Sequence, residues 1–370
     1  MSNQNSSQTV NILSDGEVKR FELSGVGPRP DWWFVRPDEI KAQCEKIKKG
    51  VCTVEATTPM GFPVHRVVYN DFETTGNTVN WISAVGCRNP ELFSNADIQT
   101  VMITGGIHGC EIEGVVLIEN LISLLETGVD LRGEKRPELL ELVSKYRLVL
   151  FPCVNMDGRA ISPDHRINAV EDECRQAGGG IWSDGSTIVW PQMKEHFPLP
   201  LDKVIYKGGY PNSEGYNIQL DGAPGNVKTA EAEAILKTAA EKKVDMFLNL
   251  HSQPGSPLSF ITEPSVCSYP YQIEVTNELR VLCSGALTVL GYKNPFGENS
   301  KLECSTRIDI NTAVQMCCGA AAATFEFAAR EPGSFERILE TGYVMLETVL
   351  KYGLSKPFCD RKNWHTLNKK

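Results

Sequence analysis

The stretch TGGIHGCEIEG, residues 104–114, decides the fold because it joins a buried apolar run to an amphipathic one. Before it, QTVMI at 99–103 is typical of a buried strand, and after it apolar side chains recur at helical spacing up to residue 128. In between, His108 and Glu111 stand three residues apart among glycines, which permit sharp backbone turns. The stretch therefore predicts a strand–loop–helix unit that holds an imidazole and a carboxylate at the end of a strand.

Apolar strands and amphipathic helices keep alternating after this unit. The predicted ranges are 147–155, 244–252 and 320–328 for strands, and 136–146, 229–243 and 335–352 for helices. Such alternation predicts an α/β fold with a largely parallel sheet covered by helices. Ligands of these sheets gather at the carboxyl ends of the strands. His108, Asn155, His251 and Glu326 all lie at or near such ends, which makes this edge the expected site.

The composition is that of a globular protein of 370 residues. No run of 18 apolar residues occurs, so we expect no membrane span. The formal net charge of −9 argues against nucleic acid and anionic membrane surfaces as partners, because both attract positive patches. The start, MSNQNSSQTVN, lacks the basic and apolar parts of a secretory signal, so we expect a cytoplasmic protein. The oligomeric state stays open.

Two histidines and a glutamate are candidate metal ligands. A catalytic zinc ion takes three protein ligands, commonly from His, Glu, Asp or Cys, and keeps one position for water. His108 and Glu111 can supply two, and His251, at the end of another predicted strand, is the candidate third. Either histidine alone could be a buried residue bonded to the backbone. Together with Glu111 and Glu326 they favour a Zn²⁺ site.

Glu326 lies among alanines and phenylalanines in ATFEFAAR, where an ionised carboxylate is unfavourable unless it is paired or used. One interpretation is a salt bridge to Arg330 or another cation. The other is a general base that takes a proton from metal-activated water. Cys110, between two candidate ligands, is more simply a packing residue than a centre of thiol chemistry.

Four short motifs carry a resemblance to a known family. They are HGCE at 108–111, NMDG at 155–158, LHS at 250–252 and TFEFAARE at 324–331. In order and approximate separation they resemble HxxE, NPDG, HS and TFE of the zinc carboxypeptidases of the carboxypeptidase A type, from residue 99 to about 350. The resemblance implies a mixed, eight-stranded sheet flanked by helices. It also implies that His108, Glu111 and His251 hold zinc, and that Glu326 activates water and passes the proton to the departing amine.

The resemblance extends to the groups around the metal. The family stabilises the oxyanion with an arginine found shortly after NPDG, and Arg166 in DHRINAV is the best match. Arg159 and Arg175 are near enough to compete. Asn155 and Asp157 of the NMDG motif are expected to contact the substrate.

The chain departs from the family at the substrate anchor. Family members hold the terminal carboxylate with an Asn-Arg pair in a stretch like DLNRN, since a guanidinium grips a carboxylate through two hydrogen bonds. Here the corresponding stretch is GYNIQLDGAPGN, with Gln219 in place of the asparagine and Leu220 in place of the arginine. The family's tyrosine, which precedes the TFE glutamate by about twenty residues, has no counterpart after Tyr292. Gln219 and Arg307 are therefore the candidate substrate-binding residues of an altered anchor.

These features predict a zinc-dependent hydrolase that cleaves an amide bond in a peptide or peptide-like substrate. The scaffold also resembles the aspartoacylase and succinylglutamate desuccinylase group, so an N-acyl amino acid deacylase is the alternative. A second alternative is a zinc-bearing, catalytically silent binding protein that lost the peptidase pocket. The specificity pocket is expected from the loops at 163–228 and 255–315, which determine the substrate.

The chain before residue 99 has a different pattern. A helix is predicted over 37–49, and short strands rich in β-branched residues are predicted at 51–58, 62–71 and 77–86. The expected domains are a polar tail at 1–15, a β-rich segment at 16–95 packed on the catalytic domain, and a zinc carboxypeptidase-like catalytic domain at 96–370.

Overall fold

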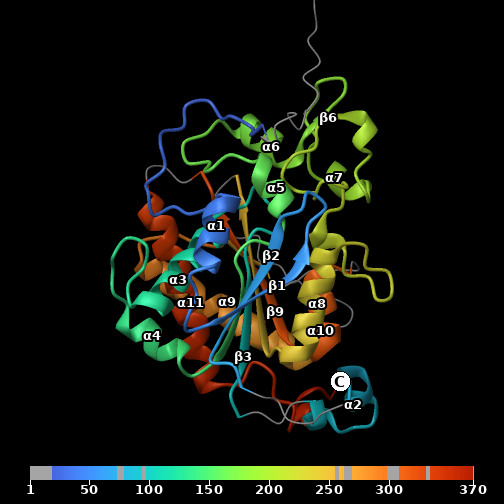
Figure 1. Ribbon diagram of the computed structural model, residues 1–370. Coiled ribbons are helices and arrows are strands. Elements are labelled where there is room, and N and C mark those ends of the chain that lie inside the picture. The colour runs from blue at the N-terminus through green and yellow to red at the C-terminus, as the bar shows by residue number, and fades with distance from the viewer. Residues whose placement is uncertain are drawn as a thin grey trace, which may run out of the picture.

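One central sheet with helices around it makes up the computed structural model in Figure 1. The structure describes residues 19–72, 79–93, 97–254, 258–261, 269–297, 308–330 and 334–369. Within these ranges the sheet has seven strands in the order β1-β2-β4-β3-β7-β9-β8. They are β1 Val51–Thr57, β2 Pro63–Tyr69, β3 Thr100–Thr104, β4 Arg147–Phe151, β7 Met246–Gln253, β8 Ser259–Ile261 and β9 Ala321–Ala328. A separate antiparallel pair consists of β5 Ile181–Trp182 and β6 Val204–Tyr206.

Helices cover both faces of the sheet. On one face lie α1 Pro37–Cys44, α3 Glu113–Thr127, α4 Pro137–Val143, α9 Pro270–Val289 and α11 Phe335–Ser355 (Figure 1). On the other lie α8 Ala230–Lys242 and α10 Ile310–Cys318. The shorter helices are α2 Trp81–Gly86, α5 Met156–Ile161, α6 Glu171–Gly179, α7 Gln192–Glu195 and α12 Trp364–Leu367. Within the described ranges, no helix combines the length and the apolar character needed to cross a membrane.

The middle of the sheet is parallel and its edges are antiparallel. Strands β4, β3, β7 and β9 run parallel, while β2 pairs antiparallel with β4 and β8 pairs antiparallel with β9. The mixed, largely parallel sheet flanked by helices that the sequence predicts is therefore confirmed. Seven of its strands are described, against the eight expected.

Alternate side chains of the central strands enter two separate hydrophobic cores. Val101 and Ile103 of β3 pack with α3, α9 and α11, whereas Met102 packs on the opposite face with α8 and α10. Successive residues of a strand point to opposite faces, so a strand covered on both sides must be apolar throughout. This is why the central strands are recognisable in the sequence as largely apolar runs, with few polar interruptions such as Asn249 in β7 and Thr324 in β9.

The first helix is shorter than predicted. It ends at Cys44 rather than continuing to residue 49. The backbone N–H groups of Lys48, Lys49 and Gly50 donate to the Glu126 carboxylate at 2.9, 3.0 and 3.1 Å. These bonds to α3 replace the helical ones and direct the chain into β1.

The strand predicted over 77–86 is wrong in its described part. Residues 81–86 form helix α2, whose first turn is capped by Asn80: its side-chain oxygen accepts from the Ser83 N–H at 2.8 Å. Asparagine at this position is a common helix start. The Trp81 ring packs edge-on against Trp364, with ring centroids 4.8 Å apart. Capping and this aromatic contact outweigh the β-branched composition that suggested a strand.

The opening strands extend the central sheet. β1 and β2 form an antiparallel pair, as predicted, and β2 continues the sheet through β4. The division into a β-rich segment at 16–95 and a catalytic domain at 96–370 stays a prediction. The excursion at 163–228 contains short elements that lie at one end of the sheet, at the top of Figure 1.

A side chain at Gly109 should disrupt the loop after β3. A Cβ atom there would lie 2.1 Å from the Arg159 backbone nitrogen and 2.2 Å from the Gly158 carbonyl carbon, and backbone cannot move aside cheaply. We expect Gly109→Ala to lower the free energy of unfolding by about 3 kcal/mol, measured by thermal or urea unfolding. Gly86→Ala is the control, because a Cβ there meets nothing within 4 Å. Equal stability of the two variants would contradict this packing.

Glu231 should make the stability depend on pH. It is buried in the first turn of α8, and burial raises its pKa from 4.5 to about 7, although Asn212 donates to it at 3.3 Å. Between these values the folded chain holds the proton more tightly than the unfolded chain, so the free energy of unfolding falls as the pH rises, and the loss is complete above about 7.

The substitution Glu231→Gln removes this charge while keeping the shape. At about pH 8 it should raise the free energy of unfolding by at most about 3 kcal/mol, and at about pH 4 it should change it little. Urea unfolding across the pH range measures the effect. The exposed Glu233→Gln on the same helix is the matched control. A gain from Glu231→Gln that is equal at both pH values would refute this origin.

Candidate metal centre and pocket

The loop after β3 is bent so that two polar side chains face each other. Gly106 adopts a φ of 58°, which favours glycine, and the Glu111 N–H donates to the His108 carbonyl at 3.0 Å. The Gly109 N–H donates to the Gly209 carbonyl at 2.8 Å, which fixes the loop against the long excursion. The sequence-predicted strand–loop–helix unit is thus observed, with α3 starting at Glu113.

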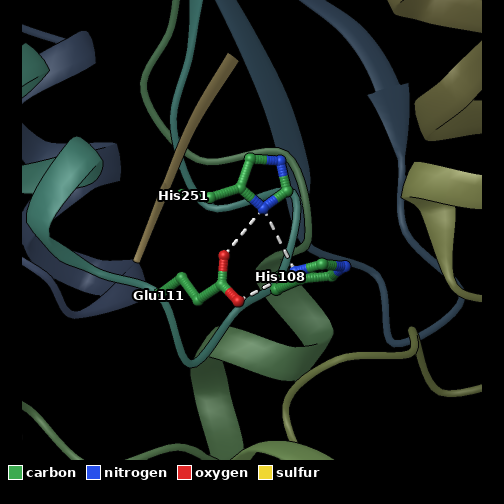
Figure 2. Close-up of side chains that lie close together, drawn as sticks. All are labelled: His108, Glu111 and His251. Atoms are coloured by element: carbon green, nitrogen blue, oxygen red, sulfur yellow. Dashed lines mark hydrogen bonds and ion pairs between the residues drawn. The ribbon is translucent and has the colours of Figure 1, made fainter. Parts of the chain in front are cut away.

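Three buried side chains meet at this end of the sheet (Figure 2). Nδ1 of His108 lies 3.0 Å from Oε1 of Glu111, and Nδ1 of His251 lies 2.8 Å from Oε2 of the same carboxylate. The two Nδ1 atoms are 3.2 Å apart. Because β3 and β7 are parallel neighbours, His251 on β7 reaches the loop that follows β3. Among the described residues this is the one such group of three possible metal ligands.

The chemistry of these donors fits a zinc ion. Nε2 of His108 lies 3.1 Å from the Asn217 side-chain oxygen, which can only accept, so the ring carries its proton on Nε2 and presents a lone pair at Nδ1. Burial raises the pKa of the Glu111 carboxyl group, whereas His108 and His251 in their protonated forms hold it well below the usual range, and a metal cation in place of those protons would act in the same direction. Two imidazole nitrogens and one carboxylate are a ligand set of catalytic zinc sites. His108, Glu111 and His251 can therefore hold Zn²⁺.

Asn217 contacts a candidate metal ligand, His108, and is not among the residues predicted from the sequence. It lies just before the short 3₁₀ turn Ile218–Leu220, and its side-chain oxygen also accepts from the Gln219 N–H at 3.1 Å. A partner on the second ring nitrogen orients a metal-binding histidine and fixes its tautomer. Its position in the predicted anchor stretch, two residues before Gln219, is the one sequence feature that points to the site, but an asparagine in a loop has many possible roles.

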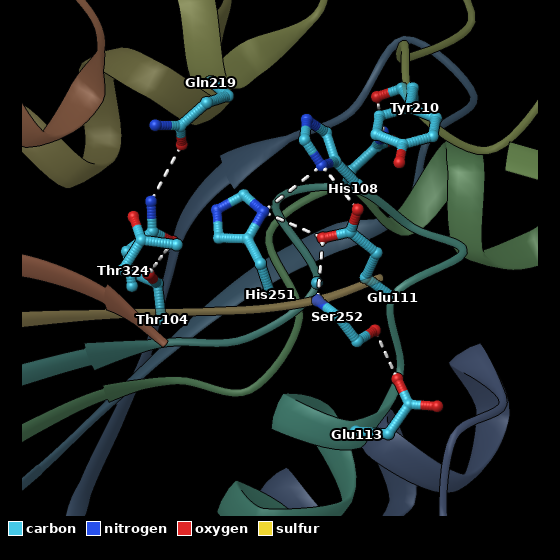
Figure 3. A network of polar contacts seen from close by, with 12 residues as sticks. Thr104, His108, Glu111, Glu113, Tyr210, Gln219, His251, Ser252 and Thr324 are labelled. Atoms are coloured by element: carbon cyan, nitrogen blue, oxygen red, sulfur yellow. Dashed lines mark hydrogen bonds and ion pairs between the residues drawn. The ribbon is translucent and has the colours of Figure 1, made fainter. Parts of the chain in front are cut away.

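Ser252 lies between Glu111 and Glu113 (Figure 3), and Glu113 forms a buried ion pair with Arg166. The Ser252 N–H donates to the Glu111 carboxylate at 3.2 Å, and its hydroxyl contacts the Glu113 carboxylate. Arg166 donates to Glu113 at 3.3 Å and to the Ser252 hydroxyl. Neither Ser252 nor Glu113 was among the predicted site residues.

Of the three arginines considered, burial and contacts single out Arg166. It is buried and lines the cavity beside the three ligands. Arg159 is also buried, but it donates to the carbonyls of Gly109 at 2.9 Å and Ser162 at 2.6 Å and lies outside the cavity. Arg175 lies at the rim, paired with Glu171 at 2.6 Å.

Asn155 and Asp157 do not line the cavity. Both are fully buried. The Asn155 side chain caps α5 and donates to the Tyr210 carbonyl at 3.0 Å, and the Asp157 carboxylate accepts from the Ser213 N–H at 3.1 Å. They hold the loop that carries Tyr210, whose ring centroid lies 4.2 Å from that of His108. The structure thus gives them a supporting position instead of the predicted substrate contact.

Glu326 lies on β9 directly opposite His251 on β7 and lines the cavity. Burial, followed by the charge of Glu111, raises the pKa of its carboxyl group to about 7. Arg330 does not pair with it: its guanidinium donates to Glu171 at 2.9 Å and to the Ala169 carbonyl at 2.8 Å. Among the described residues, neither Arg330 nor another cation forms the salt bridge considered from the sequence, and Glu326 lines the space beside the metal ligands.

The cavity has a volume of about 460 Å³. Besides the groups above, its wall contains Gln219 and Leu220, from the stretch where the sequence predicts an altered anchor. Arg307 lies outside the described residues. Cys110 is buried and outside the cavity, and burial raises the pKa of its thiol to about 12, which agrees with a packing role.

Removal of the Asn217 oxygen should weaken metal binding. We expect Asn217→Leu to lower the Zn²⁺ affinity by about tenfold or more, because His108 loses the partner that fixes its tautomer. Competition with a chromogenic chelator measures the affinity. Asn217→Asp is the matched control, since it keeps an oxygen acceptor and should bind zinc at least as tightly as wild type. Equal affinities for all three proteins would exclude this role.

Comparisons with known proteins agree with the geometry. The zinc carboxypeptidase family model matches residues 76–278. A metallo-carboxypeptidase from Burkholderia cenocepacia is 15% identical with a TM-score of 0.53, covering 86% of this chain and 69% of that chain. A metallo-carboxypeptidase from Pseudomonas aeruginosa, solved with (2-guanidinoethylmercapto)succinic acid, is 14% identical with a TM-score of 0.53. That match covers 86% of this chain and 68% of that chain. Bovine thrombin-activatable fibrinolysis inhibitor, in complex with tick carboxypeptidase inhibitor, is 12% identical with a TM-score of 0.50. That match covers 88% of this chain and 99% of that chain. A search of curated proteins found no match.

The likeness to solved structures shows the fold, and the family match shows that this chain belongs to the zinc carboxypeptidase family and is a zinc hydrolase.

Proposed function

We propose that this chain hydrolyses an amide bond in a peptide or peptide-like substrate, with a substrate anchor that differs from the family's. The main support for this function is that Glu326 and Arg166 line the same cavity as the three candidate metal ligands, which are His108, Glu111 and His251. Proton transfer, charge stabilisation and metal binding can therefore act on one bound group.

His108, Glu111 and His251 would hold the zinc ion, with Asn217 and the Ser252 N–H orienting them. When bound, zinc acts as a Lewis acid that polarises a carbonyl oxygen and lowers the pKa of water. The open cavity beside these ligands is where the substrate carbonyl would lie.

Glu326 is the proposed general base and acid. Its carboxylate accepts a proton from the water that attacks the carbonyl carbon and donates it to the amide nitrogen as the C–N bond breaks. The products are a carboxylic acid and an amine. Its placement directly across from His251 supports this role.

Arg166 is the proposed stabiliser of the negative charge that develops on the carbonyl oxygen. A buried guanidinium that is held in place before the reaction stabilises such charge without reorganisation. The Glu113 carboxylate and the Ser252 hydroxyl, both of which contact its guanidinium, hold Arg166 in place.

The rim of the cavity favours a peptide-like substrate over a small N-acyl amino acid. Val189, Trp190, Met193 and Lys194 line it, and the Lys194 ammonium lies 3.7 Å from the Trp190 ring centroid. Trp190 is 54% exposed, so it offers an aromatic face for parts of a substrate beyond the cleaved bond. Arg307 stays a candidate for a substrate carboxylate, on sequence grounds.

Replacement of Glu326 by glutamine tests the proposed function. The variant should lose turnover of peptide substrates by about 10³-fold, because no group remains to move the proton, and should still bind zinc. Hydrolysis of an N-acyl dipeptide panel measures turnover, and elemental analysis measures zinc. Glu336→Gln, an exposed position on α11, is the control. Unchanged turnover in Glu326→Gln would end the assignment, and binding without turnover in wild type would favour a silent binding protein.

A further inference from the structure

A cluster of amide and hydroxyl groups forms one end of the cavity, beside His251 (Figure 3). Four of its members line the cavity: Gln219, Asp309, Asn311 and Thr324. Asn249 on β7 lies behind them, fully buried. The cluster contains the anchor position Gln219, and none of these five side chains is a cation.

Asp309 fixes which way every amide in the cluster points. Its carboxylate can only accept, so Gln219 must turn its Nε2 toward it, at 3.4 Å from Oδ2. The Gln219 oxygen then faces Asn249, whose Nδ2 donates to it at 2.8 Å. The other hydrogen of that nitrogen goes to the Asn311 oxygen at 2.9 Å, which turns the Asn311 nitrogen toward the Thr324 hydroxyl at 2.9 Å.

Asn249, behind the cavity wall, uses all its hydrogen-bonding groups within the described part of the protein, whereas Gln219 and Asn311, which line the cavity, do not. The Asn249 oxygen accepts from the Thr104 hydroxyl at 3.0 Å, and both hydrogens of its nitrogen are used. Gln219 and Asn311 each use one hydrogen of their amide nitrogens within the described part of the chain. One N–H of each is therefore left for a ligand in the cavity, next to acceptor oxygens on Asp309 and Thr324.

This arrangement suits a neutral group with one acceptor and one donor. A carboxylate would face the negative charge of Asp309 without a cation in the cluster to offset it. An alkyl group would leave the N–H donors without partners, and an ammonium group would face those donors. A carboxamide satisfies both sides, because its oxygen accepts and its nitrogen donates.

We propose that this cluster binds an uncharged carboxamide of the substrate. The carboxamide oxygen accepts from the amide nitrogens of Gln219 and Asn311, and its –NH₂ donates to Asp309 or Thr324. This inference rests on the proposed function, since it names the substrate class of the same cavity. The carboxamide can come from a glutamine or asparagine side chain or from an amidated chain end.

Kinetics on matched substrates test the inference. One series of N-acyl dipeptides ends in Gln, Glu, Met or Lys, and a second compares a terminal Ala with its carboxamide. If the cluster binds a side-chain carboxamide, the zinc-loaded protein should show a kcat/KM at least about tenfold higher for the Gln substrate than for the Glu, Met and Lys substrates. If it binds an amidated chain end, the same preference should appear for the carboxamide over the substrate with a terminal Ala.

Two variants locate the preference. Asn311→Leu removes one N–H donor, so the Gln and Met substrates should become equal. Asp309→Asn keeps an oxygen that can cap α10, where Asp309 accepts from the Thr312 N–H at 2.9 Å, but removes the charge, so the Glu substrate should gain. The exposed Asn226→Leu is the matched control and should keep the wild-type ranking.

The outcomes separate this inference from the proposed function. Turnover of all substrates with equal kcat/KM overturns the carboxamide site and leaves the hydrolase assignment in place. If nothing is hydrolysed, the proposed function fails, and calorimetry on the zinc-loaded protein then compares N-acetylglutamine with N-acetylmethionine and N-acetylalaninamide with N-acetylalanine. Tighter binding of either amide supports the cluster's role, and equal affinities within both pairs overturn it.

Discussion

The buried contact between two imidazole nitrogens is the constraint on which the site depends. Nδ1 of His108 and Nδ1 of His251 lie 3.2 Å apart, with the Glu111 carboxylate beside both. Unprotonated nitrogens and a carboxylate this close, away from water, repel one another unless a proton or a metal cation lies among them. The parallel pairing of β3 and β7 imposes the closeness, since it places the loop after one strand beside the end of the other. A zinc ion in this position would be bound by all three side chains and would keep one coordination position for water.

Support for the centre comes from very few side chains. The Ser252 N–H bonds to Glu111 while the Ser252 hydroxyl contacts both Glu113 and Arg166. Metal ligand and guanidinium are thus linked through one serine at the end of β7. On the other side Asn217 fixes the His108 ring. Because these partners are buried, the geometry of the cavity is set before a substrate arrives, as electrostatic stabilisation requires.

The proposed altered anchor would change the groups that contact the substrate and leave the reacting groups in place. Gln219 and Leu220 leave no guanidinium at the anchor stretch, yet Glu326 and Arg166 remain beside the ligands. In place of a cation stands a chain of amides whose polarity is set by Asp309. The proposed carboxamide site would discriminate by hydrogen-bond complementarity, because a poorly matched group leaves its N–H donors unpaired and a carboxylate meets the charge of Asp309.

Local pattern was enough to predict His108, Glu111, His251 and Glu326 as site residues, because each lies in a short motif next to an apolar strand. The structure places all four around one cavity. Only tertiary structure distinguished Arg166 from Arg159, since the two differ in their surroundings and not in their sequence neighbourhood. Only tertiary structure, too, revealed Asn217 and the Asn249 cluster, whose partners lie up to 145 residues away. The helix at 81–86 depends likewise on a distant tryptophan. A polar side chain acquires its role from the partners that packing brings to it, and those partners leave no local mark in the sequence.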